Sequence, residues 1–260
     1  MFVVAIAELV SPTEDDMTAI AAAIGASTYD VRMRLAAGVP AVLMTTSDEA
    51  AARATAQAIG ARGHGAIVCD SRDVVPGPAM VPVRHFVLGE DALRADRAQP
   101  DELPYRQMRV LVHVAHRELR HVIGHEMVYV GPREGMARRE VITDEHDSPH
   151  SLYIFPSDGT TPWILREREA HYTALGAAAG PARHMNFLAT IAALRARAPI
   201  AHFDDRFATH PRSPSHYTRS YGHPEGESSP WADHDADLAA HLLARWLSRT
   251  SSDPYRSTAG

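Results

Sequence analysis

The 260-residue chain contains no lysine, because all 26 of its basic residues are arginine. This absence excludes a Schiff-base lysine, a Walker-type phosphate-binding lysine, a kinase β3 lysine and a Ser–Lys dyad. Most P-loop, kinase-like and pyridoxal-phosphate enzymes are therefore excluded. The formal net charge of −6 gives the chain no overall attraction for nucleic-acid phosphates.

The chain has a single cysteine, Cys69, which excludes an intrachain disulfide and a zinc site built from several cysteines. Cys69 ends a predicted buried strand without local basic activation, so we expect an inert core thiol. The chain also lacks the run of about 18 apolar residues that a membrane span needs. Its apolar N-terminus has no signal-peptide pattern and predicts a strand. We expect a cytoplasmic protein.

Residues 3–70 carry the most consistent local signals. An apolar first strand, which should bury much of both faces, precedes a helix with Thr13 as its cap and Asp16 in the capping-box position. Gly25 supplies the end of that helix. A second helix is predicted from residue 27 or 28 to Gly38.

The pattern after Gly38 adds a strand, a helix and a last strand. The strand AVLMTT follows Pro40, Ser47 is the expected cap of the third helix, and Gly60 is its expected end. The sequence AIVCD, which ends at Asp70, closes the unit. The predicted order is β-α-α-β-α-β, with the helices on one face of a three-stranded sheet.

This order resembles the C-terminal domain of ribosomal protein L7/L12. The resemblance rests on the helical pair, Pro40 and its strand, the helix start at 47–50 and the glycine-bounded last strand. It implies a small protein-docking fold. That family contacts translation GTPases through helical residues that include lysines. Because this chain has Asp30, Arg32 and Arg34 in the second helix, the ribosomal role is not expected.

An alternative interpretation makes residues 16–37 a DNA-binding helix-turn-helix. Arg32 and Arg34 would then meet bases or phosphates in the major groove. The flanking strands and the acidic residues Asp15, Asp16 and Asp30 favour a helical hairpin packed on its own sheet.

The second part of the chain follows a segment with three prolines and a glycine. Short apolar strands are then predicted in succession, and the clearest hairpin is SLYIFP-SDG-TTPWILRE. An amphipathic helix follows over about 182–197. Antiparallel strands closed by one helix resemble a pleckstrin-homology-like (PH-like) barrel, which implies binding of lipids, peptides or proteins.

The predicted fold class is α+β, with a small β-α-α-β-α-β module and a mostly antiparallel β domain closed by a helix. The predicted segments are the L7/L12-like module 1–73, the proline-rich linker 74–83, the PH-like domain 84–200, the flexible segment 201–230, the C-terminal helix 231–248 and the disordered tail 249–260. The C-terminal helix either packs on its own chain or docks on a partner or a second copy. Its candidate partner-binding residues are Trp231, Leu238, Leu242 and Trp246.

Histidine is abundant, with 16 residues. Neutral imidazole binds zinc, copper and nickel when two or three rings meet at one point. A helix would place His121 and His125 on one face, whereas a strand would place His113 and His116 on opposite faces. A second cluster follows at 144–150, where carboxylates accompany imidazoles. The candidate metal ligands are His113, His116, His121, His125, His146 and His150.

The segment DGTTPWILRERE offers the best candidates for binding another ligand. Trp163, Arg166 and Arg168 are its candidate binding residues, with Glu167 between the two arginines. On a strand both arginines would lie on one side and could bind a phosphate or carboxylate. The alternative is a strand edge with cross-strand ion pairs. His184 and Asn186 precede the apolar stripe of the following helix, and a capping or buried hydrogen-bonding role is expected for Asn186.

No complete catalytic or cofactor motif is present. The sequence therefore predicts a non-enzymatic interaction or adaptor protein that binds a protein partner or assembles with itself, and no cofactor. Nucleic acid is not the expected partner, and no membrane span is expected. The alternatives are a DNA-binding regulator that uses residues 16–37 and a metal-dependent hydrolase built on the histidines, with zinc or another transition metal.

Overall fold

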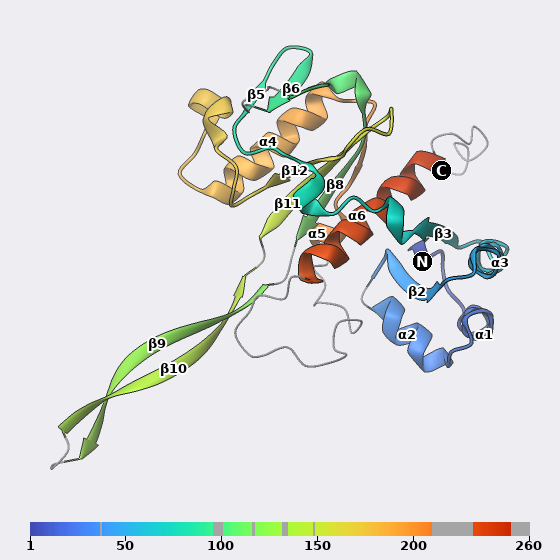
Figure 1. Ribbon diagram of the computed structural model, residues 1–260, viewed down its shortest axis with the longest axis horizontal. Helices are drawn as coiled ribbons and strands as arrows, with labels where there is room; N and C mark the ends of the chain where they lie inside the picture. Colours follow the sequence, from blue (N-terminus) through green and yellow to red (C-terminus); the bar gives the residue numbers. More distant parts are fainter. Residues whose placement is uncertain are drawn as a thin grey trace.

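The computed structural model describes residues 1–36, 38–95, 101–115, 118–131, 135–147, 149–209 and 231–250. The structure is α+β, as predicted from the sequence. One helix, α6 (Trp231–Thr250), lies between two β-sheets (Figure 1). Within the described residues no helix combines the length and the apolar character that crossing a membrane requires.

The first sheet belongs to the N-terminal module, whose element order is the predicted one. Its elements are β1 (Phe2–Glu8), α1 (Glu14–Ile24), α2 (Thr28–Ala36), β2 (Ala41–Thr46), α3 (Glu49–Gly60) and β3 (Gly65–Asp70). The strand order is β2-β1-β3, and both neighbours of β1 run antiparallel to it.

Local sequence determines where these helices begin and end. Thr13 and Asp16 form the predicted capping box of α1, and Gly25 ends the helix in the left-handed conformation, φ 65°. The predicted cap of α3 was wrong by one residue. Asp48 is the cap, because its carboxylate accepts a hydrogen bond from the Ala51 amide.

Both faces of β1 are buried, as expected. Val4 and Ile6 pack with Leu43 beneath α1, α2 and α3. Ala5 and Ala7 point to the other face, which α6 covers. The small side chains on that face allow the helix to approach closely, so the last helix of the chain completes the core of the first module.

The second sheet has five strands in the order β13-β8-β11-β12-β4. Its strands are β4 (Val81–Pro82), β8 (Met108–Ala115), β11 (His150–Pro156), β12 (Trp163–Arg166) and β13 (His202–Asp204). The predicted hairpin is confirmed, because β11 and β12 pair antiparallel. Strands β4 and β13 at the two edges each pair parallel with their neighbour.

A layer beyond this sheet holds α4 (Arg183–Arg197) and a three-stranded sheet. The small sheet consists of β5 (Phe86–Leu88), β6 (Ala92–Ala95) and β7 (Asp101–Pro104). Phe187, Ile191 and Leu194 of α4 pack against the five-stranded sheet, which confirms the predicted amphipathic helix. The opposite face of the five-stranded sheet packs on α6.

A two-stranded ribbon, β9 (Glu118–Gly131) and β10 (Gly135–Asp147), extends from the five-stranded sheet (Figure 1). It continues the pairing of β8 with β11 in the same register. Ala115 lies opposite His150 at the end of the sheet, and Glu118 lies opposite Asp147 at the start of the ribbon. The histidines of β9 are thus on a strand, not on a helix.

Three segment predictions need correction. Part of the predicted linker 74–83 is strand β4, and Gly77 within it is buried. The predicted flexible segment 201–230 begins with β13 and α5 (Arg206–Thr209), and its residues 210–230 lie outside the described part of the chain. The predicted tail begins inside α6, which ends at Thr250, and residues 251–260 are not described.

Helix α6 presents three stripes to its surroundings. Leu238, Leu242 and Trp246 pack on the first sheet. A second stripe of small and apolar residues packs on the five-stranded sheet and contains Ala236, Ala240, Leu243 and Ala244. The third stripe is polar and is hydrogen-bonded to residues 73–77, which connect the two sheets. Asp237 accepts from the Gly77 amide, His241 accepts from the Val75 amide, and Arg245 donates to the Asp73 carboxylate.

Asp237 is the most buried charge at this contact, with 1% of its surface exposed. Its carboxylate accepts hydrogen bonds from the Gly77 amide, at 2.6 Å, and from the Tyr153 hydroxyl, at 2.9 Å. The Arg166 guanidinium approaches so closely that a Cβ on Gly77 would lie 2.5 Å from its Nη2. A side chain at this position would therefore displace the Arg166 guanidinium.

We predict that Asp237→Ala lowers the free energy of unfolding by about 2–3 kcal/mol, because buried donors lose a charged acceptor. Tyr153→Phe, which removes one donor and leaves the carboxylate bonded, should cost about 1 kcal/mol. Urea unfolding measures both. The exposed Asp91 provides the control, and Asp91→Ala should change stability by less than about 0.5 kcal/mol. Equal losses for Asp237→Ala and Asp91→Ala would contradict the role of the buried carboxylate.

The burial of His241 should make the free energy of unfolding depend on pH. Burial lowers its pKa to about 4, and the Val75 amide donates to its Nε2 at 3.1 Å, which requires an unprotonated nitrogen. Between pH 4 and about 6.5 the unfolded chain binds the proton more readily than the folded chain. Stability should therefore be full above pH 6.5 and fall as the pH is lowered towards 4. His241→Gln should flatten this fall in urea unfolding across that range, and an unchanged slope would show that His241 does not cause it.

Candidate metal site

Four side chains meet at one end of the five-stranded sheet, on its α4 face. His113 lies near the end of β8, His150 begins β11, and Glu167 directly follows β12. These strands are neighbours and alternate in direction, so the three residues lie at the same end of the sheet. His184, in the first turn of α4, completes the cluster.

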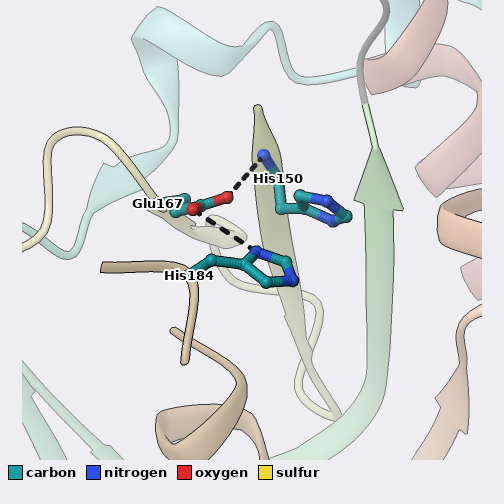
Figure 2. Close-up of side chains that lie close together, drawn as sticks. All are labelled: His150, Glu167 and His184. Carbon is teal, nitrogen blue, oxygen red and sulfur yellow. Dashed lines mark hydrogen bonds and ion pairs between the residues drawn. The ribbon is translucent and has the colours of Figure 1, made fainter. Parts of the chain in front are cut away.

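His150, Glu167 and His184 form the part of the cluster that can hold a metal ion. Each offers one ligand atom, and these atoms all lie within 4.8 Å of one another. The Glu167 carboxylate accepts a hydrogen bond from the backbone amide of His150 at 3.2 Å, and its other oxygen lies 3.4 Å from Nδ1 of His184 (Figure 2). Tyr172 fixes the local backbone, because its hydroxyl donates to the Glu167 carbonyl at 2.8 Å.

His113 lies behind His150, further into the core. Its Nε2 lies 2.8 Å from Nδ1 of His150, so one ring donates and the other accepts. Phe187 of α4 packs against both rings, with centroid distances of 5.4 and 6.1 Å. The hydrogen bond occupies Nδ1 of His150 and leaves its Nε2 as the ligand atom that a metal can use.

Burial favours the neutral form of two of these imidazoles, His113 and His150. Burial, with a smaller contribution from His150, lowers the pKa of His113 to about 4. Burial also lowers the pKa of His150, and Glu167 partly opposes this effect. Neutral imidazole and ionised carboxylate are the forms that bind a metal ion. The side chain of Glu167 is 13% exposed and that of His184 is 45% exposed, so the site opens to solvent on the α4 side.

Of the six predicted metal ligands, the structure brings together His113 and His150. His121 and His125 lie on β9 and His146 lies on β10, and only the backbone of these strands is described. His116 lies outside the described residues. The two ligands that complete the described site, Glu167 and His184, were not predicted as metal ligands.

The predicted arginine site does not form as expected. Trp163 is buried in the core beneath α4, not exposed for a ligand. Strand β12 ends at Arg166, so Arg168 is in the following turn and the two arginines do not lie along one strand. Arg166 lies beside Gly77 and within 3.7 Å of Glu169, an ion pair within the turn that follows β12 and not the cross-strand pair of the alternative interpretation.

The predicted partner-binding residues of α6 are mostly used within the chain. Leu242 is fully buried, and Leu238 and Trp246 are half-buried against the first sheet. The helix therefore packs on its own chain through these three residues, and their role in binding a partner stays a prediction. For Trp231 the structure describes only the backbone, so its predicted role stays a prediction.

Asn186 has the predicted hydrogen-bonding role. Its side chain is bonded to both backbone groups of Gly180, accepting from the amide at 2.7 Å and donating to the carbonyl at 2.9 Å. These bonds fix the chain that enters α4 and so position His184 in its first turn. The sequence did contain a signal for Glu167, because alternate residues of a strand face the same side of the sheet. Glu167 continues the alternation of Trp163 and Leu165, which face α4.

The chain matches no protein-family model, no curated protein and no solved structure. The resemblances to the L7/L12 C-terminal domain and to PH-like domains therefore stay predictions.

Proposed function

We propose that this protein binds one divalent transition-metal ion through His150, Glu167 and His184, and that the bound ion carries a hydrolytic activity. The observation that supports the proposal is the convergence of three ligand atoms from three separate elements. Zinc is the best match, because two imidazoles and a carboxylate are a ligand set of catalytic zinc sites.

The chemistry of the site supports catalysis more than a purely structural ion. Structural zinc is enclosed by four protein ligands, whereas a catalytic ion has three and an open position for water, and the part of the chain that the structure describes supplies three. Such an ion lowers the pKa of its bound water and so supplies a nucleophile at neutral pH. Because the side chain of His184 is 45% exposed, water would have access to an ion held by these residues.

His113 has a positioning role in this proposal. A metal-bound histidine usually bonds its second nitrogen to a neighbouring group, which fixes its tautomer and ring orientation. His113 provides that partner for His150 at 2.8 Å. Because His113 is buried, with 7% of its surface exposed, its ring is held firmly by the core.

The DNA-binding alternative receives less support. Helices α1 and α2 pack on their own sheet, and Arg32 of α2 forms an ion pair with Glu14 of α1. If the protein instead acts by binding a protein partner, the binding surface should lie outside α6, because that helix packs between the two sheets of its own chain.

We predict that the full-length, tag-free protein binds one zinc ion per chain by isothermal titration calorimetry and elemental analysis. Glu167→Gln and His184→Ala should each weaken binding by at least about tenfold, because each removes a ligand. The matched control is Glu169→Gln, two residues from Glu167. Glu169 pairs with Arg84 instead, so its loss should leave zinc affinity unchanged. Equal zinc binding by the Glu167 and Glu169 variants would overturn the proposed ligand set.

Cobalt substitution tests the open position. Four-coordinate Co²⁺ has strong visible absorption, and a small anion such as azide changes the spectrum only where it reaches the ion. We expect an azide-dependent spectrum in the wild type. A Co²⁺ spectrum insensitive to azide would leave the metal site intact but contradict the hydrolytic role.

A separate prediction concerns His113. His113→Leu should keep one zinc ion per chain but lower its affinity about 10–100-fold, because His150 loses the group that orients it. Calorimetry at neutral pH measures the affinity. His202→Ala, a half-buried histidine on β13, is the control and should have no effect. Loss of the stoichiometry itself would instead make His113 a ligand.

A further inference from the structure

The ribbon formed by β9 and β10 is the largest described feature that the metal site does not use. Its strands contain 14 and 13 residues and, within the described residues, pair only with each other. It extends away from the rest of the molecule (Figure 1). A two-stranded ribbon is marginally stable in water, and its outer edges carry backbone groups that another strand can bind.

We propose that the outer edge of β9 pairs antiparallel with the same edge of a second copy of this chain, with Ile123 opposite Ile123 on the two-fold axis. The product is a four-stranded sheet in the order β10-β9-β9-β10. A two-fold interface uses the same surface on both copies, so the pairing must be complementary to itself. This proposal is independent of the proposed metal site.

The charges along the strands support this register. With Ile123 on the axis, Arg120 lies opposite Glu126 of the second copy. Within each ribbon, Arg139 lies opposite Glu126 and Glu145 lies opposite Arg120. The row across all four strands is therefore Arg139, Glu126, Arg120 and Glu145, with alternating sign. Two-fold symmetry produces this row twice, and opposite charges on neighbouring strands stabilise a sheet.

The apolar positions support the same register. Ile142 lies opposite Ile123 within each ribbon, so the central row contains four isoleucines. In the proposed pairing Leu119 also lies opposite Met127 of the second copy. The apolar positions therefore meet one another at the centre of the sheet and on either side of it.

The neighbouring arrangements are poorer. Placing Val122 on the axis puts Glu118 opposite Glu126, which brings like charges together on the two copies. Placing Gly124 on the axis leaves Arg120 opposite an apolar residue. Pairing through β10 about Ile142 puts Glu140 opposite Asp144. Self-pairing through β9 about Ile123 places no like charges opposite each other and forms two Arg120–Glu126 contacts, and its remaining mismatch is Glu118 opposite Val128 at the two ends.

Charge-swap variants test the partner and the edge. Arg120→Glu alone places two glutamates opposite each other, and Glu126→Arg alone places two arginines opposite each other. In a mixture of the two variants both contacts become complementary. Sedimentation of the full chain in the presence of a chelator should show a dimer for the wild type. Each single variant should dimerise with an affinity lower by about tenfold or more, and the mixture of the two variants should form a heterodimer.

The mixture also controls for folding, because a variant that fails to fold cannot restore a dimer. A wild type that stays monomeric across the dilution series would overturn the proposal. Dimers unaffected by either single substitution would place the contact elsewhere, on the β10 edge or on another surface, and would also overturn it. Failure of the mixture to dimerise would reject the Arg120–Glu126 register.

Cysteine cross-linking measures the register directly. Ile123→Cys places two thiols opposite each other on the axis, within reach of a disulfide. The native thiol interferes little, because Cys69 is fully buried. Mild oxidation should convert Ile123→Cys to a covalent dimer, whereas Val128→Cys, opposite Glu118 of the second copy, should not cross-link. Cross-linking of Val128→Cys in preference to Ile123→Cys would refute the proposed axis.

Discussion

The packing of α6 between two sheets is the contact on which the rest of the structure depends. The sheet of the N-terminal module has helices on one face, and its other face consists of small apolar residues such as Ala5 and Ala7 that need a cover. The five-stranded sheet has α4 on one face and the same requirement on the other. One helix satisfies both sheets, so its surroundings are apolar on two sides. Gly65 shows how closely the helix approaches, because a Cβ there would lie 2.5 Å from Trp246.

The polar stripe of α6 gives this packing its specificity. Apolar contacts alone would permit the helix to slide along or rotate between two smooth faces. Asp237, His241 and Arg245 lie four residues apart and each bonds to a defined group of the segment that connects the two sheets. A slide of one turn would leave a buried carboxylate and a buried imidazole without these partners, which is costly in the interior. The connecting segment is therefore part of the folded core and not a free linker.

Local signals predicted the N-terminal module because each of its elements is specified by nearby residues. Thr13 with Asp16, and Gly25, act within a few positions of themselves, so their roles could be assigned from the sequence. The burial of both faces of β1 was also predictable from its composition. What covers the second face was not, because α6 follows more than 220 residues later and its apolar stripes do not identify the surface they bind. The same limit separated Leu238 and Leu242 from their partners and suggested a docking helix.

The candidate metal site was only half predictable for a related reason. Histidine content directed attention to His113 and His150, and both belong to the cluster that the structure brings together. The ligands, however, come from β11, the end of β12 and the first turn of α4, and sequence spacing carries no information about which ends of neighbouring strands meet. Closeness in the sequence instead favoured, as metal ligands, the four histidines that lie within residues 113–125. Once β8, β11 and β12 are known to be adjacent, residue parity places His113, His150 and Glu167 on the face that α4 covers.

The metal site and the ribbon share one structural origin. Strand β8 carries the buried His113 and strand β11 carries the half-buried His150, and β9 and β10 pair in the same register as β8 and β11. The site therefore lies where the ladder leaves the support of α4 and becomes a two-stranded ribbon. Ligands from β11, from the chain after β12 and from α4 would tie this point to the body of the protein, which gives the ribbon a fixed base. A bound ion would make this base more rigid, whereas the proposed pairing of two β9 edges depends only on the register of their own residues and does not require the ion.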